Sequence, residues 1–423
     1  MTTDTAASPV TAARDHLVGP LALVVSEDVG IVHSVDDGVT RWDHPRAAPG
    51  FTALADTAPT LGVALSARPG GMAVDLAAAR TAAVGEAVER YSASHAPESR
   101  LRLARPAELI AEVGADNVAG PDWSGAASEH PRVHWLPGHR LRADGPAQPA
   151  WVAAARALLV HLDADAPVLH PTSSGLACHD DPWQALAAGL AEVIERDAFM
   201  TTWLTRGPVT RIRSRLRWRT SRGAVMRFDR AVETYRLFLL PSPTGVPVVL
   251  AAAFGAPGQP GAAVGAAADL DLARACRRAL VEAFQTFHWA MHMIADGVDA
   301  PARPGDCRDF DEHVAYYLPH ERLGSFDFLH DPALPELDVD LDEPAPAAEP
   351  ERTARTLIDR VAAAGHTAFA VDVTSPDVRA AGLWVVRATV PGFYPLHVGV
   401  DVFPVGTRLD PRAIVNRDPH PFP

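Results

Sequence analysis

Apolar residues recur with helical spacing in four segments of the chain. The clearest segment, 182–204, is apolar almost all round, which is typical of a buried helix. Asp180 or Asp181 supplies an N-cap, and Pro182 suits the first turn. The other helices are predicted at 72–93, from Asp269–Asp271 to about 294, and at 351–365.

Short apolar runs bounded by Gly and Pro predict strands between these helices. They lie within 17–71, at 133–136 and 151–160, over 211–240 and 246–254, and at 367–373, 383–390 and 396–402. Residues 1–16 have the composition of a flexible tail, and the stretches near 100–165 and 295–350 that of irregular insertions. Long helices mixed with many short strands predict an α+β (mixed α/β) fold.

Composition and charge narrow the functional classes. All 38 basic residues are arginine, which excludes a Schiff-base lysine, a P-loop lysine and a kinase-type lysine. With 52 acidic residues the net charge is −14, and a chain this acidic is not expected to bind nucleic acid.

Cysteine usage and hydropathy predict a cytoplasmic protein. Cys178, Cys276 and Cys307 form no C-x-x-C pair, which is typical of a reducing compartment. The N-terminus has no apolar core of a secretory signal. The most apolar stretch, 237–256, is interrupted by prolines, so we interpret it as core strands rather than a membrane span.

Three of the predicted helices repeat a polar pair at spacing i, i+3, which places both side chains on one helix face. The pairs are Glu86 with Glu89, Glu192 with Glu195, and Glu282 with Gln285. One such pair is commonly a solvated face, but buried carboxylates need a partner or a cation. Oxygen ligands without His or Cys favour Mg²⁺, so the pattern predicts a magnesium-nucleotide site without a P-loop.

Longer motifs around these pairs resemble the YcaO superfamily of ATP-dependent enzymes that activate backbone amides. The most specific motif is HPTSSGLACHDDPWQALAAGLAEVIERDAF, from His170 to Phe199. Supporting motifs follow the expected order at Ala83–Ala93, Arg277–Gln285, Ala370–Thr374 and Thr389–Leu396. The resemblance covers residues 60–423 and implies a YcaO-type fold, with sheets packed against long helices around an ATP and Mg²⁺ site. It implies a catalytic domain over 72–418, after a β-rich part at 17–71.

The resemblance also assigns roles to individual residues. The implied Mg²⁺ ligands are Glu86, Glu89, Glu192 and Glu195, the implied phosphate-facing catalytic residues are Arg196 and Arg278, and the remaining nucleotide contacts are Ser174, Gln184, Glu282 and Gln285. Ala82, Ser174, Gln184 and the His179–Asp180 pair differ from residues common in the family. These differences leave open a degenerate YcaO scaffold that binds a leader peptide or partner without catalysis.

The chain ends Pro419-His420-Pro421-Phe422-Pro423, which fits P-x-P-x-P. Such a tail is similar to that of YcaO members that form azoline rings, where it threads to the active site and its terminal carboxylate helps to order that site. Thioamide- or amidine-forming relatives typically lack it. Polyproline geometry makes the tail stiff, so little entropy is lost in placing it. A Pro-rich disordered tail is the alternative interpretation.

The implied reaction converts Cys, Ser or Thr of a ribosomal precursor peptide to thiazoline or oxazoline. The side chain attacks the preceding carbonyl, ATP phosphorylates the resulting oxyanion, and phosphate leaves. The Pro423 carboxylate and His170 or His179 are candidate proton carriers. The implied partners are the precursor peptide, a separate ThiF-like leader-binding protein and a flavin-dependent azoline dehydrogenase. The sequence leaves a homodimer open.

Other patterns have simpler interpretations. Arginines alternate from Arg211 to Arg219 along a predicted strand, which is either an exposed charged face or a surface for an acidic leader peptide. His288 and His292 have no third ligand in view, so a zinc site is not expected. Cys178 is interpreted as a small buried thiol.

Overall fold

The computed structural model describes residues 17, 19–37, 51–56, 70–73, 76–120, 130–160, 162, 172–213, 218–219, 225–226, 234–341, 347–399 and 406–422. The tail expected at 1–16, the candidate proton carrier His170 and the terminal Pro423 lie outside the described residues.

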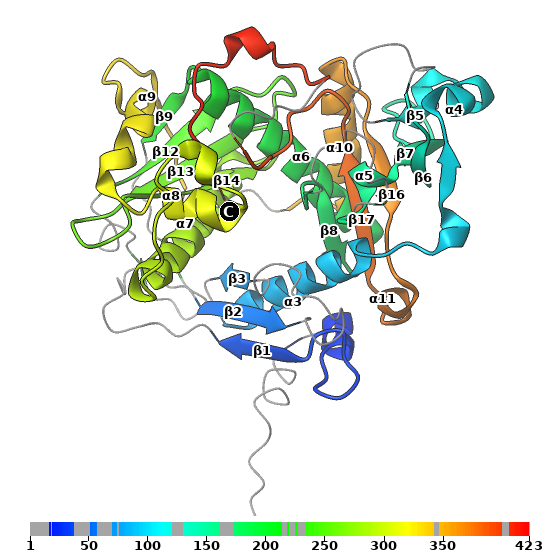
Figure 1. The fold of residues 1–423 in the computed structure, drawn as a ribbon, viewed down its shortest axis with the longest axis horizontal. Helices are drawn as coiled ribbons and strands as arrows, with labels where there is room; N and C mark the ends of the chain where they lie inside the picture. The colour runs from blue at the N-terminus through cyan, green and yellow to red at the C-terminus, as the bar shows by residue number, and fades with distance from the viewer. Residues whose placement is uncertain are drawn as a thin grey trace, which may run out of the picture.

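Two large sheets form the body of the protein (Figure 1). The first has the strand order β5-β7-β6-β16-β17-β8, with β4 beside β6, and the second has the order β14-β13-β12-β9-β15. The first contains β4 (Arg102–Ala104), β5 (Val118–Ala119), β6 (Val133–Arg140), β7 (Gln148–Ala153), β8 (Leu176–His179), β16 (Phe369–Asp372) and β17 (Trp384–Thr389), and the second β9 (Thr210–Arg213), β12 (Thr234–Leu240), β13 (Val248–Phe254), β14 (Ala262–Ala268) and β15 (Glu336–Asp338).

Helix α6 (Pro182–Thr205) connects the two sheets, because it packs against β8 and β17 of the first and β13 and β14 of the second. The Asp181 carboxylate accepts a 2.9 Å hydrogen bond from the Gln184 N–H and caps the helix. The helix ends where Arg206 adopts a left-handed conformation. Most of its residues are buried, as an apolar sequence requires.

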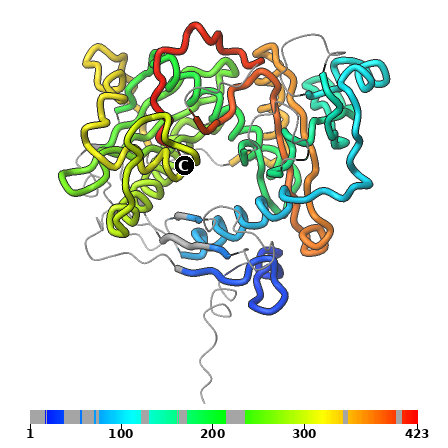
Figure 2. Tube along the Cα trace, viewed as in Figure 1, coloured from blue at the N-terminus to red at the C-terminus, as the bar shows by residue number. Residues whose placement is uncertain are grey.

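The two other acidic helices flank α6. Helix α3 (Leu76–Ala93) packs against β8 and against a small sheet of β1 (Ser34–Asp37), β2 (Phe51–Asp56) and β3 (Gly70–Ala73). Helix α7 (Leu272–Ala295) packs on β13 and β14, and α10 (Pro350–Ala363) covers α6. The C-terminal segment turns inward and ends in the middle of the molecule (Figure 2).

The mixed α/β fold class is confirmed, and helices are present at all four predicted positions, as α3, α6, α7 and α10. The strand predicted at 151–160 was too long, because it ends at Ala153 and the Ala-rich sequence turns into α5 (Ala154–Ala157). Likewise, residues 396–399 form no strand, and Gly399 has a positive φ of 95° there.

Regular structure runs through both stretches that the sequence predicted as irregular. Residues 100–165 contribute β4 to β7 and α4 (Pro106–Val113), and residues 295–350 contribute α8 (Phe310–Tyr316), α9 (Asp327–His330) and β15. Across the described residues, no helix combines the length and the apolar character that crossing a membrane requires.

Candidate active site

Arg196 lies at the centre of a buried acidic cluster. Its Nε is 3.3 Å from Oε1 of Glu195, and its Nη2 is 3.4 Å from Oε1 of Glu192 and 3.8 Å from Oε1 of Glu282. The side chain is 12% exposed. Burial works to lower the pKa of Arg196, but the three carboxylates outweigh it and raise the pKa overall, so the guanidinium stays charged.

Backbone N–H groups of both sheets fix the carboxylates of the three helices. The hydrogen bonds run to Glu195 from Ala268 (3.3 Å), to Glu282 from Ala266 (2.8 Å), to Glu192 from Gly175 (3.2 Å) and to Glu89 from Cys178 (2.8 Å). The donors belong to β14, to β8 or to the residue directly before β8. The site is therefore built where α3, α6 and α7 meet the two sheets.

A glycine makes one of these bonds possible. Gly175 has a φ of +87°, and a Cβ added there would lie 2.3 Å from the carbonyl oxygen of Ala388. Only glycine fits such a conformation at such a close approach. The close contact with β17 places the Gly175 N–H against the Glu192 carboxylate.

Burial raises the pKa of several of these carboxyl groups. Glu195 is 5% exposed, and loss of solvation raises its pKa to about 8. Burial also raises the pKa of Glu282. The pKa of Glu89 lies well above its usual range, first because of burial and then because of the nearby charges of Glu192 and Glu86. The effect of Glu192 on the pKa of Glu89 indicates that the faces of α3 and α6 lie close enough to interact.

The two glutamates of α3 have different surroundings. Glu86 is about one-third exposed and forms an ion pair with Arg90 one turn later on the same helix. Glu89 accepts a hydrogen bond from the Cys178 N–H. This bond and the charge of Arg90 work to lower the pKa of Glu89, but burial and the charges of Glu192 and Glu86 outweigh them and raise it. Glu86 is thus neutralised locally, whereas Glu89 faces the α6 carboxylates.

Arg278, the second predicted phosphate-facing residue, is more exposed than Arg196. Arg278 is 54% exposed, and its Nη1 is 3.8 Å from Oδ2 of Asp269. It still acts on the cluster, because its charge works to lower the pKa of Glu195 and Glu282. Arg278 therefore lies at the rim of the acidic cluster.

Gln285, Ser174 and Gln184 complete the predicted set. The Gln285 amide donates a 3.2 Å hydrogen bond to the Gly70 carbonyl of β3, and Ser174 is buried beside Gly175. Gln184 is exposed in the first turn of α6, about 12 Å along the helix axis from Glu192. The structure brings Gln285 and Ser174 to the elements that carry the cluster, but not Gln184.

The donor set fits a divalent cation held together with phosphates. Within the described part of the chain, no group of three or more His, Cys, Asp or Glu side chains is arranged to hold a metal ion. Yet Nη1 of Arg196 is buried without a hydrogen-bond partner, whereas its Nε and Oε1 of Glu195 face each other as an ion pair at 3.3 Å. A buried cationic N–H group of this kind suits a phosphate oxygen, and the carboxylate oxygens around it are the ligand type that a divalent cation takes.

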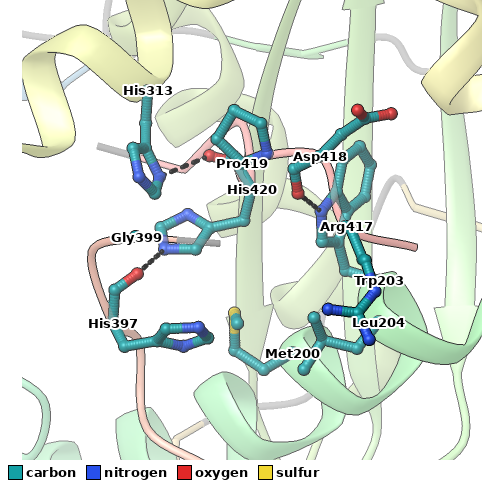
Figure 3. A pocket seen from close by; sticks show the side chains of 10 residues that line it. All are labelled: Met200, Trp203, Leu204, His313, His397, Gly399, Arg417, Asp418, Pro419 and His420. Carbon is teal, nitrogen blue, oxygen red and sulfur yellow. Dashed lines mark hydrogen bonds between the residues drawn. The ribbon is translucent and has the colours of Figure 1, made fainter. Parts of the chain in front are cut away.

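The C-terminal segment docks on α6 beside Trp203, and Figure 3 shows its residues Arg417 to His420 there. The Trp203 indole donates to the carbonyl of Asp418 (3.1 Å) and the Tyr317 hydroxyl to that of Pro419 (2.6 Å). Phe422 is fully buried, and its ring centroid lies 3.9 Å from Cζ of Arg196. The predicted threading of the tail toward the acidic helices is therefore observed up to Phe422.

Sequence reasoning missed the histidines that hold this segment. The His420 imidazole contacts the carbonyl of His397 through Nε2 (3.1 Å), and the carbonyl of His420 contacts Nδ1 of His313 (3.1 Å). Burial lowers the pKa of His313 and of His397 to about 4, and that of His420 well below its usual range. His313 is 107 residues from His420 in sequence, and no local motif marks it.

Other candidates lie away from the cluster. His179 is exposed and pairs with Asp180 at 2.6 Å. Arg211 and Arg213 pair with Glu336 and Asp338 of the neighbouring strand, which fits an exposed charged face rather than a free basic surface. Burial raises the pKa of the Cys178 thiol, as expected for an inert cysteine.

The sequence matches the family model of the YcaO cyclodehydratases, described as ATP- and Mg²⁺-binding, over residues 70–394. The chain belongs to the YcaO family. In this YcaO protein the match spans all three acidic helices and β17. No curated protein matches the chain in sequence.

Solved structures support the same fold for this YcaO chain. YcaO from Methanopyrus kandleri bound with AMPPCP and Mg²⁺ is 22% identical with a TM-score of 0.62, covering 87% of this chain and 89% of that one. A heterocyclase in complex with substrate and cofactor is 19% identical with a TM-score of 0.67, covering 100% and 58%. The E. coli microcin synthetase McbBCD complex gives 12% identity and a TM-score of 0.58, covering 85% and 88%.

The family membership makes this protein an ATP-dependent cyclodehydratase with ATP and Mg²⁺ as its cofactors. The carboxylates and the arginine described above are the chemical groups that such cofactors need, since Mg²⁺ takes oxygen ligands and phosphates bind guanidinium groups.

Proposed function

We propose that this YcaO protein converts Cys, Ser or Thr of a ribosomal precursor peptide to thiazoline or oxazoline by phosphorylating the backbone amide oxygen. A substrate side chain attacks the preceding carbonyl carbon, and the oxygen is lost as phosphate after the ring closes. Mg–ATP supplies the phosphoryl group that turns this oxygen into a leaving group. The observation that carries the proposal is the tail, whose Phe422 lies against Arg196 inside the acidic cluster.

In this proposal Glu86, Glu89, Glu192 and Glu195 hold Mg²⁺. The raised pKa values of Glu89 and Glu195 support the assignment, because a bound cation would stabilise the charged form of both carboxyl groups. Glu86 joins them only if it exchanges Arg90 for the ion.

Arg196 and Arg278 face the phosphates in this proposal. Nη1 of Arg196 is buried without a hydrogen-bond partner, and Arg278 lies half-exposed at the rim. Both keep a positive charge near the position where negative charge develops during phosphoryl transfer. Ser174, Glu282 and Gln285 support the nucleotide, and Gln184 reaches it only if the nucleotide extends to the start of α6.

The Pro423 carboxylate is the proposed proton carrier for the substrate nucleophile. The contacts that hold its neighbour Phe422 in the cluster support this role, although Pro423 itself lies outside the described residues. This arrangement favours azoline formation over thioamide or amidine formation, in which such a tail is not expected.

We also propose that the chain works with a separate ThiF-like protein that binds the leader of the precursor peptide, and with a flavin-dependent dehydrogenase where azoles are the final product. The similar microcin synthetase is a complex of several proteins, which supports this arrangement. The cytoplasm is the proposed compartment, because the cysteines are free and the buried thiols are unreactive.

A binding-only scaffold is the second candidate. It is favoured by the internal neutralisation of the cluster, since Arg196 already pairs with three carboxylates and Glu86 with Arg90. Such a protein would bind the leader peptide or its partner without consuming ATP.

One experiment separates the two candidates. The protein is incubated with its candidate leader-binding partner, the precursor peptide and Mg–ATP, and the peptide is analysed by mass spectrometry while phosphate release is recorded. A cyclodehydratase removes one water per ring and releases phosphate, and Glu192→Ala and Glu195→Ala variants abolish both. Partner binding without ATP consumption in the wild type would establish the scaffold instead.

A further inference from the structure

Phe422 and Arg196 are in contact although they lie far apart in the sequence. The Phe422 ring centroid lies 3.9 Å from Cζ of Arg196, and the ring packs at 5.0 Å against Phe199, one turn after Arg196 on α6. The Phe422 side chain is completely buried. A charged guanidinium over an aromatic face in a desolvated position is a strong cation–π arrangement.

We propose that Phe422 is a positioning residue of the active site, whose ring fixes the orientation of the Arg196 guanidinium toward the substrate phosphates. The inference rests on the proposed function, because it needs Arg196 to face the nucleotide.

The geometry of the guanidinium explains why an aromatic partner suits this position. The N–H groups of arginine point outward in the plane of the group, and its faces carry none. Glu192, Glu195 and Glu282 approach Arg196 through Nε and Nη2. A ring at the guanidinium carbon therefore restricts the plane without consuming a donor, and Nη1 stays buried without a hydrogen-bond partner.

The ring is held from the side of the tail, independently of Arg196. The Phe422 N–H donates a 3.3 Å hydrogen bond to Nδ1 of His420. Nε2 of the same imidazole then donates to the carbonyl of His397, because only one nitrogen of a neutral imidazole carries the proton. The His420 carbonyl accepts from Nδ1 of His313 (Figure 3). This chain of contacts fixes the backbone that carries the ring.

A different role for Phe422 is a purely apolar plug that keeps the tail docked. A plug needs only volume and apolar surface, whereas a cation–π contact needs the electron density of the ring face. Fluorination removes that density in steps while it changes the size little, and cyclohexylalanine keeps the size without any π face.

The experiment places phenylalanine, its mono-, di- and trifluorinated forms and cyclohexylalanine at position 422 by nonsense suppression. Two quantities are measured: kcat/KM for ATP in ring formation, and the Kd of Mg–AMPPCP by calorimetry. We expect the logarithm of each to worsen in even steps with fluorine number, to about tenfold at three fluorines, with cyclohexylalanine at least as impaired. Hydrogen exchange of residues 416–422 should remain slow throughout, because the tail stays docked.

Fluorination of Phe393 is the matched control. That ring is buried and packs against His366, so the same series there should leave both quantities unchanged. Equal values for phenylalanine, the fluorinated forms and cyclohexylalanine at position 422 would overturn the inference. If the wild-type protein forms no rings, the proposed function fails, but the Kd series still decides whether Phe422 positions Arg196.

Discussion

The acidic cluster around Arg196 and the acidic pair of α3 use the same residue type in opposite ways. In the cluster, Glu192, Glu195 and Glu282 share one buried guanidinium that belongs to the protein. On α3, Glu86 is paired with Arg90 at the surface, and Glu89 accepts only a backbone N–H while burial and neighbouring carboxylates raise its pKa.

In the first region a side chain of the protein supplies the compensating positive charge, whereas in the second region we expect a ligand to supply it. Burying several carboxylates is costly unless a cation compensates them, and Arg196 does this for α6 and α7. Glu89 is not paired with Arg196 in this way, so under the proposed function it should gain most from a bound divalent ion. The comparison therefore predicts that the two regions respond differently to removal of charge and to addition of metal.

The largest effect is expected from Arg196→Met. Without the guanidinium, three buried carboxylates lose their shared partner, and the free energy of unfolding should fall by about 3–5 kcal/mol. Ring formation should fall by at least about 1,000-fold, since an arginine facing the phosphates contributes on this scale. Chemical denaturation and mass spectrometry measure the two effects. Arg278→Met is the matched control at the rim and should leave stability nearly unchanged, and equal destabilisation by both variants would contradict a preassembled cluster.

Glu89→Gln should separate activity from stability. The amide oxygen still accepts the Cys178 N–H, but the charge that burial disfavours is gone, so the unfolding free energy should rise by about 1 kcal/mol. Mg²⁺-dependent turnover should fall by about 100-fold through loss of a ligand. Glu86→Gln should change both quantities less. A Glu89→Gln protein that is stabilised and fully active would show that the α3 pair does not bind metal.

Deletion of residues 419–423 tests whether the tail belongs to the cluster or only to the fold. The deletion removes the Phe422 side chain that lies over Arg196. Azoline formation should therefore fall by about 10- to 100-fold. Affinity for the leader-binding partner, measured by calorimetry, should stay within error. Unchanged turnover after the deletion would show that the tail does not take part in catalysis.

The smallest expected effect is a pH dependence of tail docking. Burial holds the pKa of His420 well below its ordinary value of 6.5, so the docked imidazole is neutral. Docking is complete above about pH 6.5 and weakens as pH falls, because the undocked tail takes up a proton that the docked one does not, by up to about tenfold per pH unit. Hydrogen exchange of residues 416–422 between pH 5 and 8 measures it. His420→Asn cannot titrate and should show a flatter profile, while identical profiles would exclude His420 as the cause.

Local sequence patterns predicted much of the fold. The four helices follow from apolar periodicity and capping residues such as Asp181, since these signals act within a few turns. The strand at 151–160 was overextended because the run AAARA at 153–157 is apolar and yet favours helix. The order of strands in the two sheets depends on contacts between distant segments, which no local pattern contains.

Part of the acidic cluster around Arg196 could also be predicted from local patterns. Glu192, Glu195 and Glu282 could be linked because their spacing on helices marks a shared face, and the structure joins them through Arg196. The contact of Phe422 with Arg196 and the role of His313 could not be inferred, because they depend on the path of the C-terminal segment over the folded core.

The most direct test of the account is the binding of Mn²⁺, a magnetic substitute for Mg²⁺, measured by electron paramagnetic resonance with and without AMPPCP. The account predicts weak ion binding to the protein alone, tight binding when the nucleotide is present, and loss of the tight binding in both Glu89→Gln and Glu195→Gln. Tight nucleotide-dependent binding that survives in both variants would contradict the claim that acidic helices α3 and α6 hold the metal together.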